Sequence, residues 1–138
     1  MFSVSAKSHY GLLAVFELVA NYDKRLVQIK DIVESRHVPK NYLEQILNRL
    51  LKFGIVKSVR GNRGGYELGD HPDKITLLSV VEALEGEIHL AGETFNDLQA
   101  VNGIFAEMET CIRKSLDIPL SVIWEKQKQL GGAIVYHI

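Results

Sequence analysis

The stretch "YLEQILNRLLKFGIVKSVRGNRGGYELG", residues 42–69, decides the fold, because a helical pattern passes directly into a hairpin pattern within it. The first part carries apolar residues at the i, i+3, i+4, i+7 and i+8 spacing of one helix face. These residues are Leu43, Ile46, Leu47, Leu50 and Leu51. Pro39 suits a first helical turn and Gly54 suits the position just past a helix end. We therefore expect an amphipathic helix over about 39–53.

The second part, "VKSVRGNRGGYEL" at 56–68, has the alternation of two paired strands around a glycine-rich turn. Gly61, Gly64 and Gly65 permit the positive φ angles that a tight turn demands. Arg60 and Arg63 are then expected to project from a narrow, exposed loop. Such a loop could cradle a phosphate, bind RNA or enter a DNA groove, so the neighbouring sequence has to decide.

The polar face of the 39–53 helix combines side chains that read base edges with side chains that hold phosphates. It comprises Lys40, Asn41, Glu44, Gln45, Asn48 and Arg49. Asn and Gln pair with adenine, Glu accepts from cytosine, and Lys or Arg bonds guanine or phosphate. Because any solvated helix face is polar, this face alone does not establish nucleic-acid binding.

The elements before this helix supply the missing context. Residues 5–22 are predicted to form a largely buried helix, and "VQIKDIVESR" at 27–36 a short second one. A tight connection, "SRHVP", leads into the 39–53 helix. Helix, turn, second amphipathic helix and basic hairpin follow the order of a winged helix-turn-helix, with the third helix in the major groove and the hairpin in the minor groove. Lys52 and Lys57 are expected to contact phosphates.

Composition narrows the class of protein. The chain has 138 residues, of which 46% are apolar, which suits one domain with or without a dimerisation arm. It contains no run of eighteen apolar residues and no secretory cleavage signature at its start, so we expect a soluble, cytoplasmic protein that does not contact membranes. No GxxxxGK, HExxH or GxSxG motif is present, and we expect no enzyme.

Charge divides the chain into two halves of opposite sign. Residues 1–66 contain 11 Lys or Arg against 5 Asp or Glu, whereas 67–138 contain 5 against 12. The net charge of −1 conceals this division. A basic half that carries the arginine loop indicates a nucleic-acid-binding end, with another task elsewhere.

Beyond the hairpin, "ITLLSVVEALEG" at 75–86 predicts a fourth helix and 94–116 a long fifth one. The long helix carries a 3.5-residue apolar seam of Leu98, Val101, Phe105, Met108 and Ile112. A narrow seam on a long arm favours a homodimer interface, although packing against the same chain stays open. We expect a DNA-binding domain at 1–86, then a connector, dimerisation helix and tail at 87–138. Pro119 begins a last helix with Trp124, and "GGAIVYHI" at 131–138 is an edge strand or a packing tail.

The chain resembles the Rrf2 family of bacterial winged-helix transcription regulators over nearly its whole length. The most specific pieces are "YLEQ" at 42–45, "VRG" at 59–61 and "GGY" at 64–66. The resemblance implies a homodimeric repressor or activator on a palindromic operator, with Asn41, Glu44 and Gln45 at the reading positions and Arg60 as the wing arginine. Arg63 is an addition to the usual wing. The expected DNA-contacting set is Lys40, Asn41, Tyr42, Glu44, Gln45, Arg49, Lys52, Lys57, Arg60 and Arg63.

Many members of that family hold an iron–sulfur cluster through three closely spaced cysteines before the long helix. Here that stretch reads "GEIHLAGETFNDLQ" and contains no cysteine. The sequence therefore predicts no cluster of the usual type, no other cofactor and no metal site, and a lone His9 or His89 does not change this.

Cys111 is the single cysteine and the one candidate redox sensor. It could form a disulfide between two copies, or be a small buried thiol that packs as a hydrophobe. An unidentified protein or small-molecule effector remains open. So does an alternative function in which the winged helix is a protein-interaction module with DNA secondary.

Overall fold

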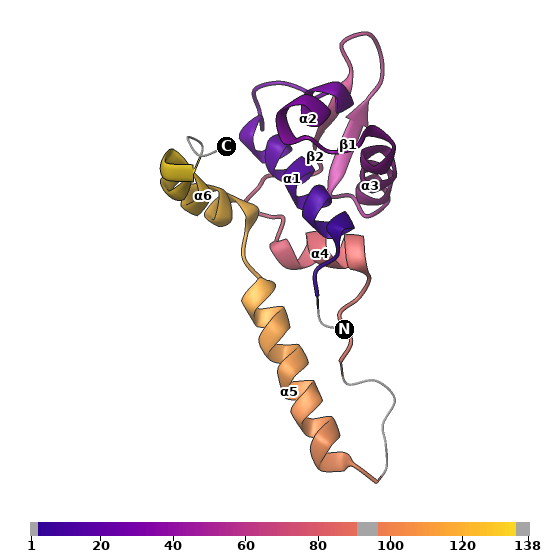
Figure 1. Cartoon of the computed structure of the whole chain (residues 1–138), viewed down its shortest axis with the longest axis vertical. Helices are drawn as coiled ribbons and strands as arrows, with labels where there is room; N and C mark the ends of the chain where they lie inside the picture. Colours follow the sequence, from indigo (N-terminus) through magenta and orange to yellow (C-terminus); the bar gives the residue numbers. More distant parts are fainter. Residues whose placement is uncertain (1–2, 91–96, 135–138) are drawn as a thin grey trace.

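The computed structural model describes residues 3–90 and 97–134. It is mainly helical with one two-stranded antiparallel hairpin, as the sequence predicts, and Figure 1 shows the hairpin and the long helix α5 at opposite ends of the molecule. The helices are α1 (Ala6–Ala20), α2 (Ile29–Arg36), α3 (Lys40–Lys52), α4 (Leu77–Glu85), α5 (Gln99–Leu116) and α6 (Leu120–Ile134), and the strands are β1 (Val56–Val59) and β2 (Gly65–Leu68).

The hydrophobic core lies among α1, α2, α3 and α4. Leu18, Ile32, Leu47 and Leu84, one from each helix, are at most 1% exposed. Burial of such a side chain contributes about 1.5 to 3 kcal/mol, so this core fixes the relative positions of the helices. Gly11 of α1 lies where an added Cβ would meet the Leu84 side chain at 2.5 Å, which lets α1 and α4 approach closely.

A polar cluster of Ser5, Ser8 and Glu85 lies at the start of α1, next to the core. The Glu85 carboxylate, at the end of α4, accepts hydrogen bonds from the backbone N–H and hydroxyl of Ser5 and from the hydroxyl of buried Ser8. The Ser5 and Ser8 hydroxyls, in that order, hold the pKa of Glu85 below its usual value, because they stabilise the charged form. The cluster joins the first helix to the last helix before the arm.

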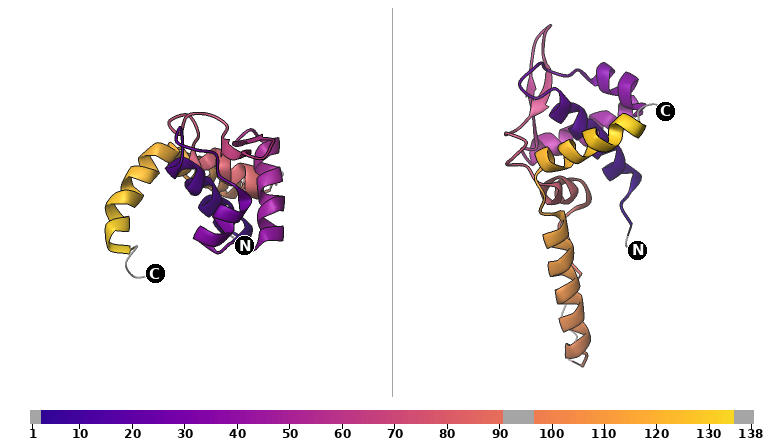
Figure 2. Two further views of the ribbon diagram at one scale, coloured as in Figure 1. Left: turned by 90° about the horizontal axis from the view of Figure 1, so that it is seen from above. Right: turned by 90° about the vertical axis from the view of Figure 1, so that its left-hand side faces the viewer.

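Helix α5 leaves this domain as an arm, and α6 then returns to it (Figures 1 and 2). Leu120 of α6 is fully buried in the core, and Trp124 stacks on Phe16 of α1 with ring centroids 6.2 Å apart. The start of α6, within the predicted 87–138 segment, thus packs on the N-terminal domain rather than extending the arm.

Two predicted boundaries differ from the structure. The arm helix begins at Gln99 rather than at Thr94, and residues 97 and 98 precede it, while 94–96 lie outside the described residues. Helix α6 runs to Ile134, so the edge-strand interpretation of 131–138 is wrong for 131–134, because the helix continues through the two glycines. Residues 135–138 lie outside the described part of the chain.

Candidate nucleic-acid interface

The recognition-type helix α3 buries one face and exposes the other as its pattern predicts. Its buried residues are Leu43, Ile46, Leu47 and Leu50. The exposed ones are Lys40, Asn41, Glu44, Gln45, Asn48, Arg49 and Lys52. Val38 is fully buried just before the helix, while His37 adopts a left-handed φ of 56° that turns the chain between α2 and α3. The polar face is therefore presented to solvent on a rigidly packed helix.

Two residues of the predicted DNA-contacting set also make contacts within the chain. Arg49 Nε donates to the carbonyl of Ala83 in α4, and its guanidinium lies 5.7 Å from the centre of the Phe53 ring. Tyr42 is half-buried and packs edge-on against Tyr10, with centroids 5.5 Å apart. These contacts help to fix α3 against α1 and α4, so removing either side chain changes the packing of the domain as well as its surface.

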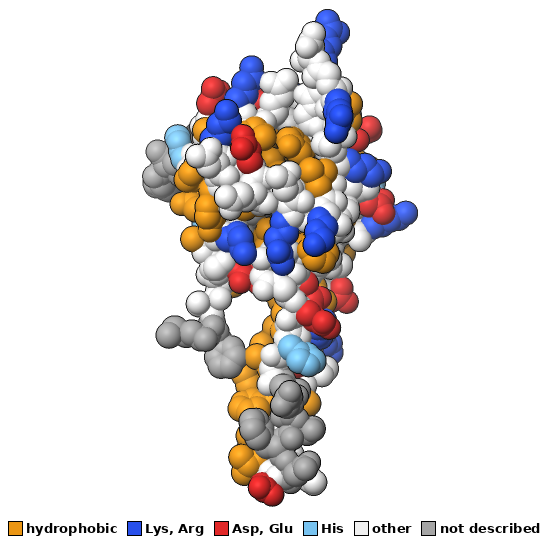
Figure 3. Space-filling view, turned by 90° about the vertical axis from the view of Figure 1, so that its right-hand side faces the viewer, with side chains coloured by type: hydrophobic (Ala, Val, Ile, Leu, Met, Phe, Trp, Pro, Cys, Tyr) orange, Lys and Arg blue, Asp and Glu red, His pale blue; other side chains and the backbone are white. Residues whose placement is uncertain are grey.

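The hairpin projects from the domain as a wing. β1 and β2 pair in register from Val56 opposite Leu68 to Val59 opposite Gly65. Arg60, Arg63 and Lys57 are exposed, and none of the three forms an ion pair among the described residues. Figure 3 shows basic side chains on the wing and on the adjoining face of the domain. The sequence prediction of an exposed, arginine-bearing loop is confirmed.

The prediction that the three wing glycines adopt positive φ angles holds for one residue, Gly61, and the other two glycines have a different role. Gly61 has the predicted positive φ, at 115°. Gly64 and Gly65 are needed for space instead. A Cβ added at Gly64 would overlap the Val59 carbonyl oxygen, and one added at Gly65 would lie 2.7 Å from the Val27 carbonyl oxygen. The hairpin therefore depends on close backbone approach at its second strand.

A third backbone segment ties the wing to the helices, which the sequence pattern did not predict. Val27 forms a β-bridge with Tyr66, through N–H to carbonyl hydrogen bonds of 2.9 Å and 2.7 Å. Gln28 then donates its side-chain amide to the Gly64 carbonyl at 3.3 Å. Its backbone N–H donates to Asp31, which holds the pKa of that carboxyl below its usual value. The wing is thus anchored at the start of α2.

Helix α5 presents an apolar face that nothing in the described chain covers. Leu98, Val101, Phe105 and Met108 of the predicted seam are 38 to 52% exposed, and Ile112 is half-buried. Ile104, which the sequence analysis missed, is 58% exposed on the same face. The i, i+3 spacing from Val101 could have identified it. Packing of the seam against the same chain is wrong for most of its length, since α5 has no buried residue.

Cys111 follows Ile104 by one heptad and is exposed. No helix among the described residues covers this position of the arm, so a thiol that packs as a hydrophobe requires a second copy to bury it. Its role as a redox sensor stays a prediction.

Comparison with known proteins identifies the group of proteins to which this architecture belongs. Residues 4–117 match the family model Rrf2, described as an iron-dependent transcriptional regulator. The chain belongs to the Rrf2 family. The HTH-type transcriptional regulator CymR of Bacillus subtilis is 32% identical over 114 residues, which cover 83% of each chain. The members of this family to which the chain is similar are named transcriptional regulators, not enzymes, and the domain is a DNA-binding winged helix-turn-helix.

Solved structures of Rrf2 proteins share the fold. The structure of CymR, the global cysteine regulator of B. subtilis, superposes with a TM-score of 0.80 at 31% identity, over 91% of this chain and 98% of that one. An IscR from T. potens gives a TM-score of 0.75 at 32% identity, over 91% and 88%. The IscR sequence of Escherichia coli matches at 34% over 85 residues, and this match spans about half of that protein, 52%.

The described residues on either side of 91–96 do not fit the iron–sulfur cluster that many Rrf2 proteins hold before the long helix. The guanidinium of Arg113 lies between Glu82 and Glu87, at 3.1 Å and 3.6 Å, and also donates to the Ile88 carbonyl. His89 Nδ1 lies 3.4 Å from Glu109. An arginine surrounded by carboxylates disfavours a cation at this position, and clusters rely on thiolates, of which the chain has one, on α5.

Among residues 3–90 and 97–134, no group of three or more His, Cys, Asp or Glu is arranged to hold a metal ion. No helix in the same ranges is long and apolar enough to cross a membrane.

Proposed function

We propose that this Rrf2 protein is a homodimer that binds a palindromic DNA operator sequence-specifically. The observation that carries the proposal is the placement on one domain of the exposed polar face of α3 beside an arginine-tipped wing. Figure 1 shows the uncovered arm at the opposite end of the molecule, which leaves both surfaces free when two arms pair. The assignment is one of binding, with no catalytic step.

Helix α3 enters the major groove and reads base edges there. Asn41, Glu44 and Gln45 are exposed on it and carry the donors and acceptors that distinguish adenine and cytosine from the other bases. Lys40 and Lys52 lie at the two ends of the helix and neutralise phosphates, which position the protein without specifying sequence. Substitution of Glu44 or Gln45 by Ala should flatten the preference among operators, whereas Lys52→Ala should weaken all sequences alike.

The wing enters the minor groove, where Arg60 and Arg63 read width and negative potential more than base identity. Narrow A/T-rich minor grooves have an enhanced negative potential that attracts inserted arginine side chains. Both guanidinium groups are exposed at a turn formed by residues with no bulky side chains, Gly61 and Asn62, which lets the loop enter a narrow groove. Lys57, near the base of the wing, contacts a phosphate of the DNA backbone.

Two copies pair through the apolar face of α5, which makes the DNA site two-fold symmetric. The face is formed by Leu98, Val101, Ile104, Phe105, Met108 and Ile112. Side chains at a and d spacing insert between those of a facing helix, so a second copy supplies the complementary surface. A two-fold protein then requires two half-sites related by the same symmetry.

The signal is not an iron–sulfur cluster of the three-cysteine type, since the chain lacks the cysteines for one. We propose that regulation comes from a protein or small-molecule effector, or from oxidation of Cys111 at the edge of the dimer face. The similar CymR of B. subtilis is the global cysteine regulator of that organism, so small molecules related to cysteine are candidate effectors to test.

The experiment is selection of binding sequences from random duplex DNA with the purified, reduced protein, followed by affinity measurements over a range of salt. We expect a palindromic motif. With about four phosphate contacts in each protomer, log K against log[salt] should have a slope of about −7 for the dimer. The binding is then repeated after mild oxidation and with Cys111→Ser.

Enrichment of no motif would reject sequence-specific binding by the protein alone. A protein ligand whose binding is insensitive to Arg60→Ala would then support the interaction-module function. Loss of DNA binding on oxidation that Cys111→Ser abolishes would assign the sensor to the thiol. Unchanged DNA binding after oxidation would exclude that role.

A further inference from the structure

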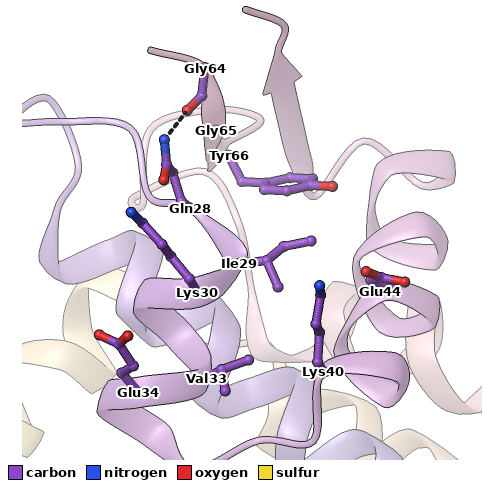
Figure 4. Close-up of a pocket in the computed structure, with 10 residues that line it drawn as sticks. All are labelled: Gln28, Ile29, Lys30, Val33, Glu34, Lys40, Glu44, Gly64, Gly65 and Tyr66. Atoms are coloured by element: carbon purple, nitrogen blue, oxygen red, sulfur yellow. Dashed lines mark hydrogen bonds between the residues drawn. The ribbon is translucent and has the colours of Figure 1, made fainter. Parts of the chain in front are cut away.

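A groove of about 530 Å³ lies between α2, the first turn of α3 and strand β2. Figure 4 shows Ile29 and Val33 at its base and Tyr66 of the wing on its upper side. If α3 occupies the major groove and the wing the adjacent minor groove, the sugar-phosphate strand that separates these two DNA grooves has to cross the protein between α3 and β2. This groove lies at that crossing.

The groove is lined by two lysines and two glutamates, and its lysines are the groups available to a phosphate. Lys30 of α2 and Lys40 of α3 are exposed, and neither forms an ion pair within the described ranges. Figure 4 shows both ammonium groups directed toward the wing side of the groove, and the carboxylates of Glu34 and Glu44 also belong to its lining. Lys40 is also the first residue of α3, where the helix dipole favours an anion.

The wing side of the groove is held in position by Gln28. Its side-chain amide donates to the Gly64 carbonyl at 3.3 Å, and the adjacent Val27 pairs with Tyr66 through two backbone hydrogen bonds. Gly64 and Gly65 contribute no side chain, so the backbone of the wing forms the wall directly. The distance between wing and recognition helix is therefore set in part from the start of α2.

We propose that this groove binds a phosphate of the DNA backbone through Lys30 and Lys40, with Gln28 as the positioning residue of its wing wall. The inference rests on the proposed function and adds Lys30 and Gln28 to the interface. Sequence patterns gave no signal for either residue, because α2 is neither the reading helix nor the wing, and the groove forms only when the chain folds.

The first test compares Lys30→Ala with Lys126→Ala, the same change at an exposed lysine of α6. We expect Lys30→Ala to weaken operator binding about fivefold. The salt slope of the dimer should become shallower by at most about 1.8, because each protomer loses one of the two cations at the phosphate and a phosphate left wholly unneutralised accounts for about 0.9 of the slope. Lys126→Ala should change neither quantity. Equal behaviour of the two variants would overturn the assignment of Lys30.

The second test identifies the phosphate. Each operator phosphate near the boundary of the two grooves is replaced in turn by a neutral methylphosphonate. At one position the affinity of wild type should fall by more than about fivefold and that of Lys30→Ala should fall by clearly less, because the variant has only the Lys40 ammonium group left to pair with that phosphate. Reductions that simply add at every position would overturn the phosphate assignment. Absence of operator binding by wild type would instead reject the proposed function.

The third test separates positioning from general stability. Gln28→Met keeps the length of the side chain but removes the amide donor. We expect reduced discrimination at the base pairs under the wing, with the preferences under α3 unchanged and the melting temperature within about 2 °C of wild type. Uniform loss of affinity across all base pairs, or no loss, would overturn the positioning role.

Discussion

The winged domain and the α5 arm differ in where their apolar side chains go. In the domain, Leu43, Leu47 and Leu50 of α3 are fully buried by neighbouring helices of the same chain. In the 18-residue arm no residue is buried, although its apolar spacing is equally regular. Helical stability in proteins comes mostly from packing of an apolar face. The apolar side chains of the domain are thus buried within one chain, whereas those of the arm require a second apolar surface to cover them.

The largest effect on assembly and DNA binding is expected when the exposed apolar face of the arm is interrupted by a charge. Phe105→Glu places a charge in the centre of the uncovered face, where pairing of two copies would bury it at high cost. We expect dissociation to monomers and roughly 1,000-fold weaker operator binding, about 4 kcal/mol, because the two half-sites are no longer bound together. Analytical ultracentrifugation and DNA titration measure the two results.

Thr110→Glu is the matched control for this substitution, since Thr110 is exposed on the opposite face of α5. The control should remain dimeric with normal affinity. A dimeric Phe105→Glu variant would contradict the assignment of the arm as the interface, and a monomeric wild type would contradict the dimer itself.

The next largest effect tests whether the core of the winged domain is complete within one chain. Leu47→Ala leaves a cavity in the core and should lower the free energy of unfolding by about 3 kcal/mol. Because the contacts lie within one chain, this difference should be the same at all protein concentrations. Denaturant titration measures it, and Leu130→Ala, at a site that is 60% exposed, should cost under about 0.5 kcal/mol. A concentration-dependent loss for Leu47→Ala would show that the domain also depends on a partner.

The same comparison explains how much the sequence could predict. The helices and the hairpin follow from apolar spacing, proline and glycine, which act locally. A regular apolar stripe does not encode whether its partner is the same chain or another copy. For this reason the seam was found from sequence, yet the uncovered state of α5 and the return of α6 to the core at Leu120 required the structure.

The candidate site divides in the same way. The exposed residues of α3 and the wing arginines were predicted, because polar spacing and turn glycines mark them. The bridge from Val27 to Tyr66, the bond from Arg49 to Ala83 and the bond from Gln28 to Gly64 were not, because each joins residues that are 34 to 39 positions apart. These contacts place the predicted side chains relative to one another, and no local pattern records them.

A smaller effect concerns the wing. Arg63→Ala should weaken binding roughly fivefold, about 1 kcal/mol, at operators with A/T-rich sequence under the wing, because the guanidinium interacts with the more negative narrow groove there. Affinity measured on paired operators with A/T-rich and G/C-rich flanks tests this. Asn62→Ala, an uncharged change in the same loop, should have no such preference. Equal losses for Arg63→Ala on both flanks would assign Arg63 to phosphate contact, and no loss would remove it from the interface.

The smallest effect concerns Glu85, at the point where the domain ends and the connector to the arm begins. Because Ser5 and Ser8 hold the pKa of Glu85 below the ordinary value of 4.5, its charged form stabilises the folded state above that value, and the contribution is lost as the pH falls through the lowered pKa. Glu85→Gln should therefore lower the melting temperature by a few degrees at pH 7, and the gap from wild type should close in acid. The exposed Glu107→Gln on α5 is the control and should show no gap at either pH. The hydrogen bonds of Glu85 join α4 to α1 of the same chain. The difference in melting temperature at pH 7 should therefore persist in the monomeric Phe105→Glu background. Its disappearance there would show that the Glu85 cluster depends on pairing of the arms.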